Sequence, residues 1–223
     1  MIEFIKNDKI KISFSIIVLM FGLLGIALEI LRAIQSDNFL GTMFVTFLYF
    51  TTQSNLLITI AVLLFIFKKN DKKFYPYFAF ISLVNISITA LIFHVILVPY
   101  MTQVDFIQHV LHTINPILYI IFYFVFFRQH LDVKKFWISL IYPLLFLVSV
   151  YTIIEPLFGD YIESIVTDFV SARYIYPFLD PRNYERETLG LLCFNLGILA
   201  PLIALLSLLL SYLKNLFDHK YND

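Results

Sequence analysis

Apolar residues fill six long stretches of the chain, each about as long as a membrane-spanning helix. About 20 residues at 1.5 Å per residue cross a hydrocarbon core of about 30 Å. The stretches are continuous and do not alternate with a period of two, so they predict helices and exclude a barrel. They cover residues 12–33, 40–67, 75–98, 106–127, 136–157 and 189–213. We therefore expect an all-α fold: one integral membrane domain over residues 1–223, with six transmembrane helices and an outer loop at 158–188.

Lysine and arginine are unevenly distributed among the predicted loops. They occur in the N-terminal arm, in KKNDKK (68–73), in the loop before residue 136 and in the C-terminal tail, whereas QSDNF (35–39) and MTQVD (101–105) have none. Cytoplasmic loops of membrane proteins are enriched in these residues. The pattern predicts a multi-pass protein of the cell membrane with both termini in the cytoplasm.

Composition supports the membrane class and excludes several others. Apolar residues make up 60% of the chain and charged residues 14%, whereas charged residues are about 25% of an ordinary soluble domain. Sixteen basic residues balance sixteen acidic ones, so the chain has no net positive charge that would favour binding of nucleic acid. The expected partners are membrane lipids. The single cysteine, Cys193, excludes an intramolecular disulfide and a multi-cysteine metal site. No cofactor motif is present.

Polar residues within the predicted spans gather in the outer halves of the helices, while the inner halves are almost purely apolar. An ionisable residue inside a span costs about 2.5–3.5 kcal/mol and usually faces a bundle interior or a water-filled cavity. Several at one depth therefore predict a polar pocket that opens to the outer side, and His109 and His112, one turn apart, are expected on one helix face. The residues are Glu29, Thr51, Thr52, Asn55, His94, His109, His112, Asn115, Glu155 and Asn195.

A hydroxyl and a histidine in such a pocket are the parts of a nucleophilic site. A threonine hydroxyl needs an adjacent base to become nucleophilic, and histidine is the usual base, oriented by an amide or carboxylate. The sequence offers Thr51 or Thr52 as the hydroxyl and His112 as the base. Asn55, Asn115 or Glu29 would orient the base or stabilise an oxyanion.

Three other interpretations remain open at this stage. His94, His109 and His112 with Glu29 or Glu155 would supply the ligands of a catalytic zinc site, although a spacing of three between histidines is common and no HExxH occurs. The same polar groups would also serve a protein that binds a lipid or small ligand without catalysis, or only pack the helices together. A transporter needs a polar path through the bilayer, which the apolar inner halves do not offer.

Three motifs resemble one family of membrane proteins: YFTTQSN (49–55), HTINP (112–116) and YPFLDP (176–181). They look like the signature stretches of the bacterial Pr6Pr family of six-helix proteins. That family is similar to the eukaryotic androgen-induced, FAR-type proteins, including the androgen-dependent regulator of tissue factor pathway inhibitor, which hydrolyse fatty acid esters of hydroxy fatty acids with one threonine and one histidine. The resemblance implies Thr51 as nucleophile and His112 as base, with Thr52 as the alternative nucleophile.

The YPFLDP motif lies in the predicted outer loop, where its two prolines exclude a continuing helix. It is expected either to stiffen the loop, with Asp180 capping the backbone, or to form a lid in which Tyr176, Phe178 and Asp180 close over a lipid chain. Neighbouring arginines would pair with a carboxylate or phosphate head group. These are Arg173, Arg182 and Arg186.

Overall fold

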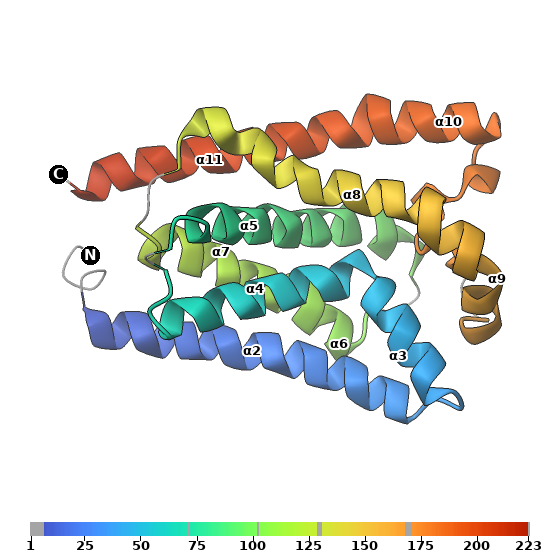
Figure 1. Cartoon of the computed structure of the whole chain (residues 1–223), viewed down its shortest axis with the longest axis horizontal. Helices are drawn as coiled ribbons and strands as arrows, with labels where there is room; N and C mark the ends of the chain where they lie inside the picture. Colours follow the sequence, from blue (N-terminus) through green and yellow to red (C-terminus); the bar gives the residue numbers. More distant parts are fainter. Residues whose placement is uncertain (1–6, 71, 102, 129–130, 168–170, 223) are drawn as a thin grey trace.

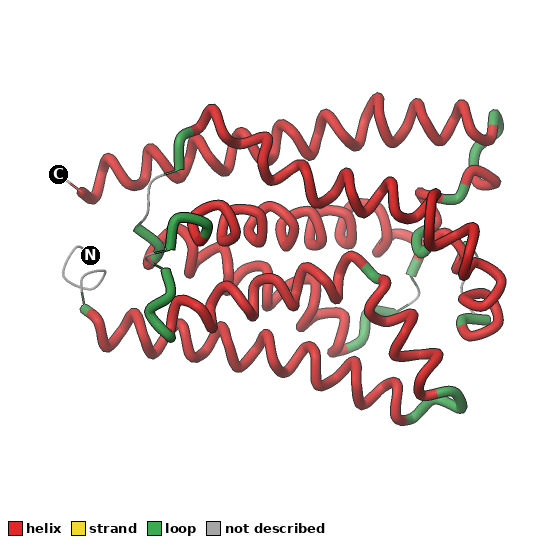
Figure 2. Tube along the Cα trace, viewed as in Figure 1, coloured by secondary structure: helices red, strands yellow, loops and turns green. Residues whose placement is uncertain are grey.

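The computed structural model describes residues 7–70, 72–101, 103–128, 131–167 and 171–222, and within them it consists of helices and loops without a strand (Figure 2). In this part of the chain five helices are long and apolar enough to cross a membrane, and a bent pair makes six if it is one span. The five are Asp8–Ile34 (α2), Tyr75–Leu97, Phe106–Phe126, Val133–Ile165 and Glu187–His219. These are the helices of a membrane-embedded protein.

The helices run side by side along the length of the molecule. In Figure 1, α5 (Tyr75–Ile92) lies between α4 (Phe50–Ile66) on one side and α8 with the two C-terminal helices on the other, while α7 (Asn115–Phe126) crosses behind α4 and packs against α5 and α2. Helix α8 is Ile141–Ser149, and the C-terminal pair is α10 (Glu187–Phe194) and α11 (Ala200–Asn222). The two ends of the chain lie at the same end of the bundle (Figure 1). Buried aromatic rings of α5 and α7 fill its centre, among them Tyr75, Phe80, Tyr119, Phe122 and Tyr123.

The second predicted span is broken. Helix α3 (Phe39–Leu48) and α4 meet at 75° at Tyr49, whose backbone is extended. A break inside a membrane leaves backbone groups without intrahelical partners. The side-chain amide of Gln53 donates to the last carbonyls of α3, those of Phe47 and Leu48, at 3.0 and 3.4 Å. The polar run at 51–55 therefore marks a helix start within the apolar stretch, which the expected continuous helix 40–67 did not allow for.

The fifth span extends beyond its predicted end at residue 157. It continues through α9 (Glu155–Ile165), so the loop before α10 is shorter than the predicted 158–188. The apolar stretch of the sequence ends near Gly159, but the helix continues to Ile165. Three carboxylates of α9 pair with one guanidinium and stabilise this polar extension. Arg173 pairs with Glu155 at 3.1 Å, with Asp160 at 3.0 Å and with Glu163 at 3.4 Å.

In the part of the chain that the structure describes, four helices contain one π-helical turn each, and each turn ends two residues before a proline. Proline lacks the N–H that would bond the carbonyl four residues earlier, and its ring clashes with that carbonyl, so the helix widens locally. The turns precede Pro99, Pro116, Pro156 and Pro201 and are Phe93–Leu97, Val110–Ile114, Val150–Ile154 and Asn195–Leu199. The sequence signal is a proline within an apolar run.

A buried lysine lies in the half of the bundle for which the sequence predicted almost purely apolar residues. Lys214, expected in a cytoplasmic tail, belongs to α11 and is 2% exposed. Its ammonium donates to the carbonyls of Phe124 and Phe127 at the end of α7 and to Asp218, the last at 2.8 Å. A cation at a helix C-terminus satisfies carbonyls that have no intrahelical donor, so Lys214 fastens α11 to α7.

Candidate functional site

The break at Tyr49 places Thr51 in the first turn of α4, where its backbone N–H has no intrahelical acceptor. The phenol oxygen of Tyr176 accepts this N–H at 3.3 Å. The side chain of Thr51 lines a cavity inside the bundle, whereas Thr52 is buried outside it. Of the two threonines predicted as nucleophile, the fold therefore presents Thr51.

The π turn Val110–Ile114 places His112. Within this turn the N–H of Asn115 bonds to the carbonyl of Val110, and the next carbonyl, that of Leu111, would need the N–H of Pro116, which does not exist. The side chain of Asn55 supplies the missing donor, because its Nδ2 bonds to Leu111 O at 3.2 Å.

Asn55 joins the two halves of the site. Its Nδ2 also donates to the carbonyl of Thr51 at 2.9 Å, and its Oδ1 accepts from Asn115 Nδ2 at 2.7 Å. One side chain thus links the backbone beside Thr51 to the backbone beside His112. Both N–H groups of the Asn55 amide are used on carbonyls, so Asn55 links two helices here and has no N–H left to donate to an oxyanion.

Thr51 and His112 lie at hydrogen-bond distance. Thr51 Oγ1 is 3.2 Å from His112 Nε2, and His112 Nδ1 is 3.0 Å from the carbonyl of Gln108. A carbonyl only accepts, so Nδ1 carries the proton and Nε2 is left to accept from the threonine hydroxyl. The ring of Phe93 stacks on the imidazole at 3.9 Å between centroids. The histidine is therefore held in the tautomer and orientation of a general base.

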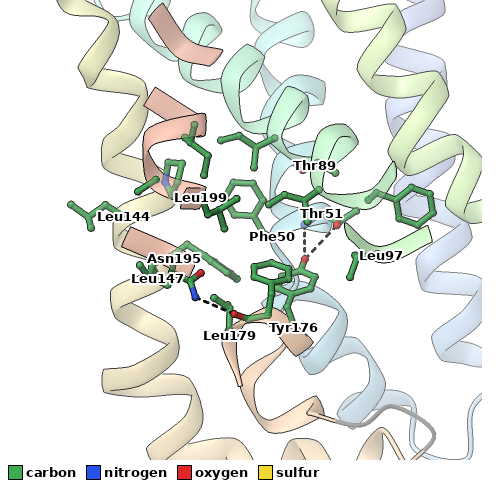
Figure 3. Close-up of a pocket in the computed structure, with 18 of the residues that line it drawn as sticks. Phe50, Thr51, Thr89, Leu97, Leu144, Leu147, Tyr176, Leu179, Asn195 and Leu199 are labelled. Atoms are coloured by element: carbon green, nitrogen blue, oxygen red, sulfur yellow. Dashed lines mark hydrogen bonds between the residues drawn. The ribbon is translucent and has the colours of Figure 1, made fainter. Parts of the chain in front are cut away.

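Thr51 and His112 line a cavity of about 290 Å³. Figure 3 shows Thr51 beside Tyr176 in its wall. Three of the four π turns contribute to its wall, and most lining side chains are aliphatic or aromatic. The polar exceptions are Thr51, Thr89, His112, Tyr176 and Asn195. Two lining side chains, Leu144 of α8 and Leu196 beside α10, are 57% and 54% exposed on the outside of the bundle. The cavity therefore reaches the apolar surface between these helices.

The other predicted histidines lie outside the cavity. His94 is exposed and bonds through Nε2 to Thr113 Oγ1 at 3.0 Å. His109 is also exposed, because a π turn has more than 3.6 residues and begins directly after it, so His109 does not share the inward face of His112. Among the described residues, no three His, Cys, Asp or Glu side chains are grouped to hold a metal ion. The ligand set of the zinc alternative is thus not brought together.

The predicted carboxylates belong to ion pairs at the ends of helices. Glu29 lies 3.8 Å from Arg32, which bonds to Asp105 at 2.8 Å. Asp105 in turn caps α6 (Phe106–His109) by accepting from the N–H of Gln108. Glu29 and Glu155 do not line the cavity. Among the predicted orienting residues, the described structure places Asn55, Asn115 and Asn195 beside the site and the two glutamates away from it.

The loop between α9 and α10 forms one wall of the cavity with Tyr176, Phe178 and Leu179. Asp180 is buried and accepts from Arg182 Nη2 at 2.7 Å. Although burial alone raises the pKa of the Asp180 carboxyl, hydrogen bonds from Arg182 lower it below the ordinary value. The Asp180 carboxylate also accepts the backbone N–H of Arg182. This is the backbone cap that one of the two predictions for the YPFLDP motif described. Arg173 and Arg182 are both bonded to carboxylates of the chain.

Comparisons of the chain with protein-family models, with characterised proteins and with solved structures found no match. No family is assigned. The functional argument therefore rests on the geometry of the site.

Proposed function

We propose that the protein is a membrane-embedded hydrolase of lipid acyl esters, with Thr51 as nucleophile and His112 as general base. The observation that carries the proposal is the 3.2 Å contact between Thr51 Oγ1 and His112 Nε2 at the polar edge of an apolar cavity. The YFTTQSN and HTINP motifs resemble those of the Pr6Pr family, and the similarity of that family to the eukaryotic FAR-type threonine hydrolases implies the same two residues.

The reaction proceeds in two halves. Thr51 Oγ1 attacks the ester carbonyl while its proton passes to His112 Nε2, and the carbonyl electron pair moves to oxygen. When this intermediate collapses, the bond to the alkoxy oxygen breaks and His112 returns the proton to the leaving alcohol. Water then attacks the acyl-threonine, gives a proton to His112, and the fatty acid leaves as Oγ1 regains a proton. The bond from Nδ1 to the Gln108 carbonyl holds the imidazolium that forms in each half.

The shape of the cavity supports a lipid as substrate. Its wall is mostly apolar, and His112 and Tyr176 both lie within hydrogen-bond distance of Thr51 Oγ1, which matches a ligand with one reactive ester and a long hydrocarbon chain. The exposed lining residues Leu144 and Leu196 lie on a surface that would face hydrocarbon. An acyl chain could pass between them directly from the bilayer, without crossing water.

We also propose that the bent pair α3–α4 is one span, so that six spans place both termini in the cytoplasm. The supports are the lysine-rich loops and the position of both termini at one end of the bundle (Figure 1). The catalytic pair then lies nearer the outer face.

The second candidate function is lipid binding without catalysis, and it is favoured by the scarcity of polar groups in the cavity.

Hydrolysis by detergent-purified protein separates the two candidates. We expect turnover of fatty acyl esters and labelling of the protein by a fluorophosphonate. Thr51→Val, which keeps the shape of the side chain, and His112→Ala should lower turnover by about 10³-fold or more. Thr52→Val is the matched control, one residue away and outside the cavity, and should keep turnover within about threefold. If the folded wild-type protein binds lipid but neither hydrolyses the esters nor reacts with the fluorophosphonate, the hydrolase is overturned and lipid binding without catalysis is the function that stands.

A further inference from the structure

The phenol of Tyr176 is a second group, besides the imidazole of His112, that lies within hydrogen-bond distance of Thr51. Its oxygen lies 3.3 Å from Thr51 N and 3.4 Å from Thr51 Oγ1 (Figure 3). Because the backbone N–H can only donate, the phenol oxygen accepts there, and its own hydrogen is available for an acceptor beside Oγ1. Tyr176 thus offers a donor within reach of the atom that the proposed reaction would use.

The backbone that carries Tyr176 is strained. Ile175 has φ +68° and ψ −40°, and the N–H of Tyr176 bonds to the carbonyl of Tyr174 at 2.7 Å, which is the geometry of a γ-turn with positive φ. A β-branched residue at positive φ is a true outlier. Such strain persists only where the surroundings enforce it, and it concentrates at active sites. Here the turn directs the phenol inward to Thr51.

The following segment is fixed by side-chain donors from three elements. Its three successive carbonyls all accept: that of Pro177 from Asn183, that of Phe178 from Tyr184 and Asn195, and that of Leu179 from Tyr151. The Tyr176 ring stacks on Phe178 at 5.2 Å. In the described structure this segment is a braced wall rather than a loosely held lid, and the phenol is preorganised.

We infer that Tyr176 is the oxyanion donor of this site, a third catalytic group beside Thr51 and His112. The inference rests on the proposed function and deepens it. When Oγ1 bonds to the ester carbon, the carbonyl oxygen becomes negative at a position two bonds from Oγ1, and the Tyr176 phenol oxygen lies 3.4 Å from Oγ1. No proton is transferred: the phenol O–H shortens its hydrogen bond to the oxyanion and relaxes when the carbonyl re-forms.

The surroundings favour Tyr176 over the amides for this role. Asn55 uses both N–H groups on carbonyls, and Asn195 Nδ2 donates to the carbonyls of Phe178 and Leu191, each at 3.1 Å. The N–H of Thr51 polarises the phenol by donating to it, which strengthens the phenol as a donor. Burial raises the pKa of Tyr176 above its ordinary value, so the group stays protonated at every pH where the hydrolase would be assayed.

Tyr176→Phe tests the inference, because it removes only the hydroxyl and keeps the ring against Phe178. We expect kcat to fall by about 10²–10³-fold with KM within about twofold, since the donor acts on the transition state and not on the bound ester. The matched control is Tyr184→Phe, which removes a phenol that braces the same segment through Phe178 but does not line the cavity. Its kcat should stay within about threefold of the wild type.

The outcomes separate this inference from the function beneath it. Wild-type turnover with an unchanged kcat in Tyr176→Phe would overturn the oxyanion role and leave the hydrolase intact, as would an equal loss in Tyr184→Phe. A folded wild type without turnover would overturn both. If Tyr176→Phe does not fold, the wild type is assayed with a thionoester, whose sulfur is a weak hydrogen-bond acceptor. Hydrolysis at least about tenfold slower than the oxygen ester supports the donor, and equal rates overturn it.

Discussion

At the scale of single residues, two neighbours hold the contact between Thr51 and His112: the Gln108 carbonyl bonds to Nδ1 of the imidazole, and the Tyr176 phenol lies within hydrogen-bond distance of Thr51. From residue types and depth, Thr51 or Thr52 could be named as the candidate hydroxyl and His112 as the candidate base, and the motif resemblance selected Thr51. The contribution of Tyr176 could not be named in this way, because it depends on a positive φ at Ile175. No local pattern predicts such a conformation for isoleucine, which only the folded surroundings enforce.

Gly25 offers a test of how closely the helices behind His112 must pack. A Cβ on Gly25 would lie 2.8 Å from Leu111 Cδ2 and 3.1 Å from Asn115 Nδ2, so Gly25→Ala pushes on the side chains that flank His112. We expect the free energy of unfolding to fall by about 1–3 kcal/mol, as for an overpacked core, and turnover to fall several-fold.

The matched control for this change is Gly197→Ala, because a Cβ at Gly197 meets no atom within 4 Å. Thermal unfolding in detergent and ester turnover measure both variants. Equal stability in the two variants would mean that α2 and α7 are not in close contact at Gly25.

At the scale of elements, hydropathy located the helices well and their irregularities poorly. The break at Tyr49 involves neither proline nor glycine, and its only signal was the polar run that satisfies the broken backbone. The π turns had a signal in the prolines within apolar runs, but whether a proline kinks, ends or widens a helix depends on which neighbours satisfy the freed carbonyls. At Leu111 that neighbour is Asn55, 56 residues away in sequence.

Pro116→Ala tests whether the π turn sets the position of His112. Alanine restores an N–H for the carbonyl of His112, so the turn can relax to an α-helical one. Proline inside a helix costs about 3 kcal/mol relative to alanine, and we therefore expect thermal stability to be kept or raised. The relaxed turn rotates His112 relative to α7 and separates it from Thr51, so turnover should fall by about tenfold or more.

Pro156→Ala is the control for the same chemistry elsewhere. Its π turn, Val150–Ile154, contributes no residue to the cavity wall, so relaxation there should leave turnover near that of the wild type. Activity retained in Pro116→Ala, with a stability gain like that of Pro156→Ala, would show that His112 reaches Thr51 without the widened turn.

At the scale of the whole molecule, the two ends of the bundle are built differently. The end that holds the chain termini is closed by Lys214 and its carbonyl partners, whereas the other half contains the cavity and the braced loop. This asymmetry corresponds to the predicted concentration of polar residues in one half of each span. Lipid penalises unpaired polar groups at every depth. A cluster of polar residues in one half of a span is therefore visible in the sequence as a place where the fold must supply partners.

For the proposed hydrolase, the orientation of the bundle decides which leaflet would supply the substrate, and the single cysteine makes this orientation measurable. Two cysteine variants are made in a Cys193→Ser background, Asp37→Cys and Lys69→Cys. Asp37 lies in the exposed loop after α2, at the end of the bundle away from the termini, and Lys69 lies in the exposed lysine-rich loop after α4. Because Lys and Arg mark cytoplasmic loops, a membrane-impermeant maleimide should label Asp37→Cys in intact cells and Lys69→Cys only after lysis. The opposite pattern would invert the protein and turn the catalytic half toward the cytoplasmic leaflet. The contact between Thr51 and His112 would be unaffected, so the hydrolase would stand with the other leaflet as its source of lipid.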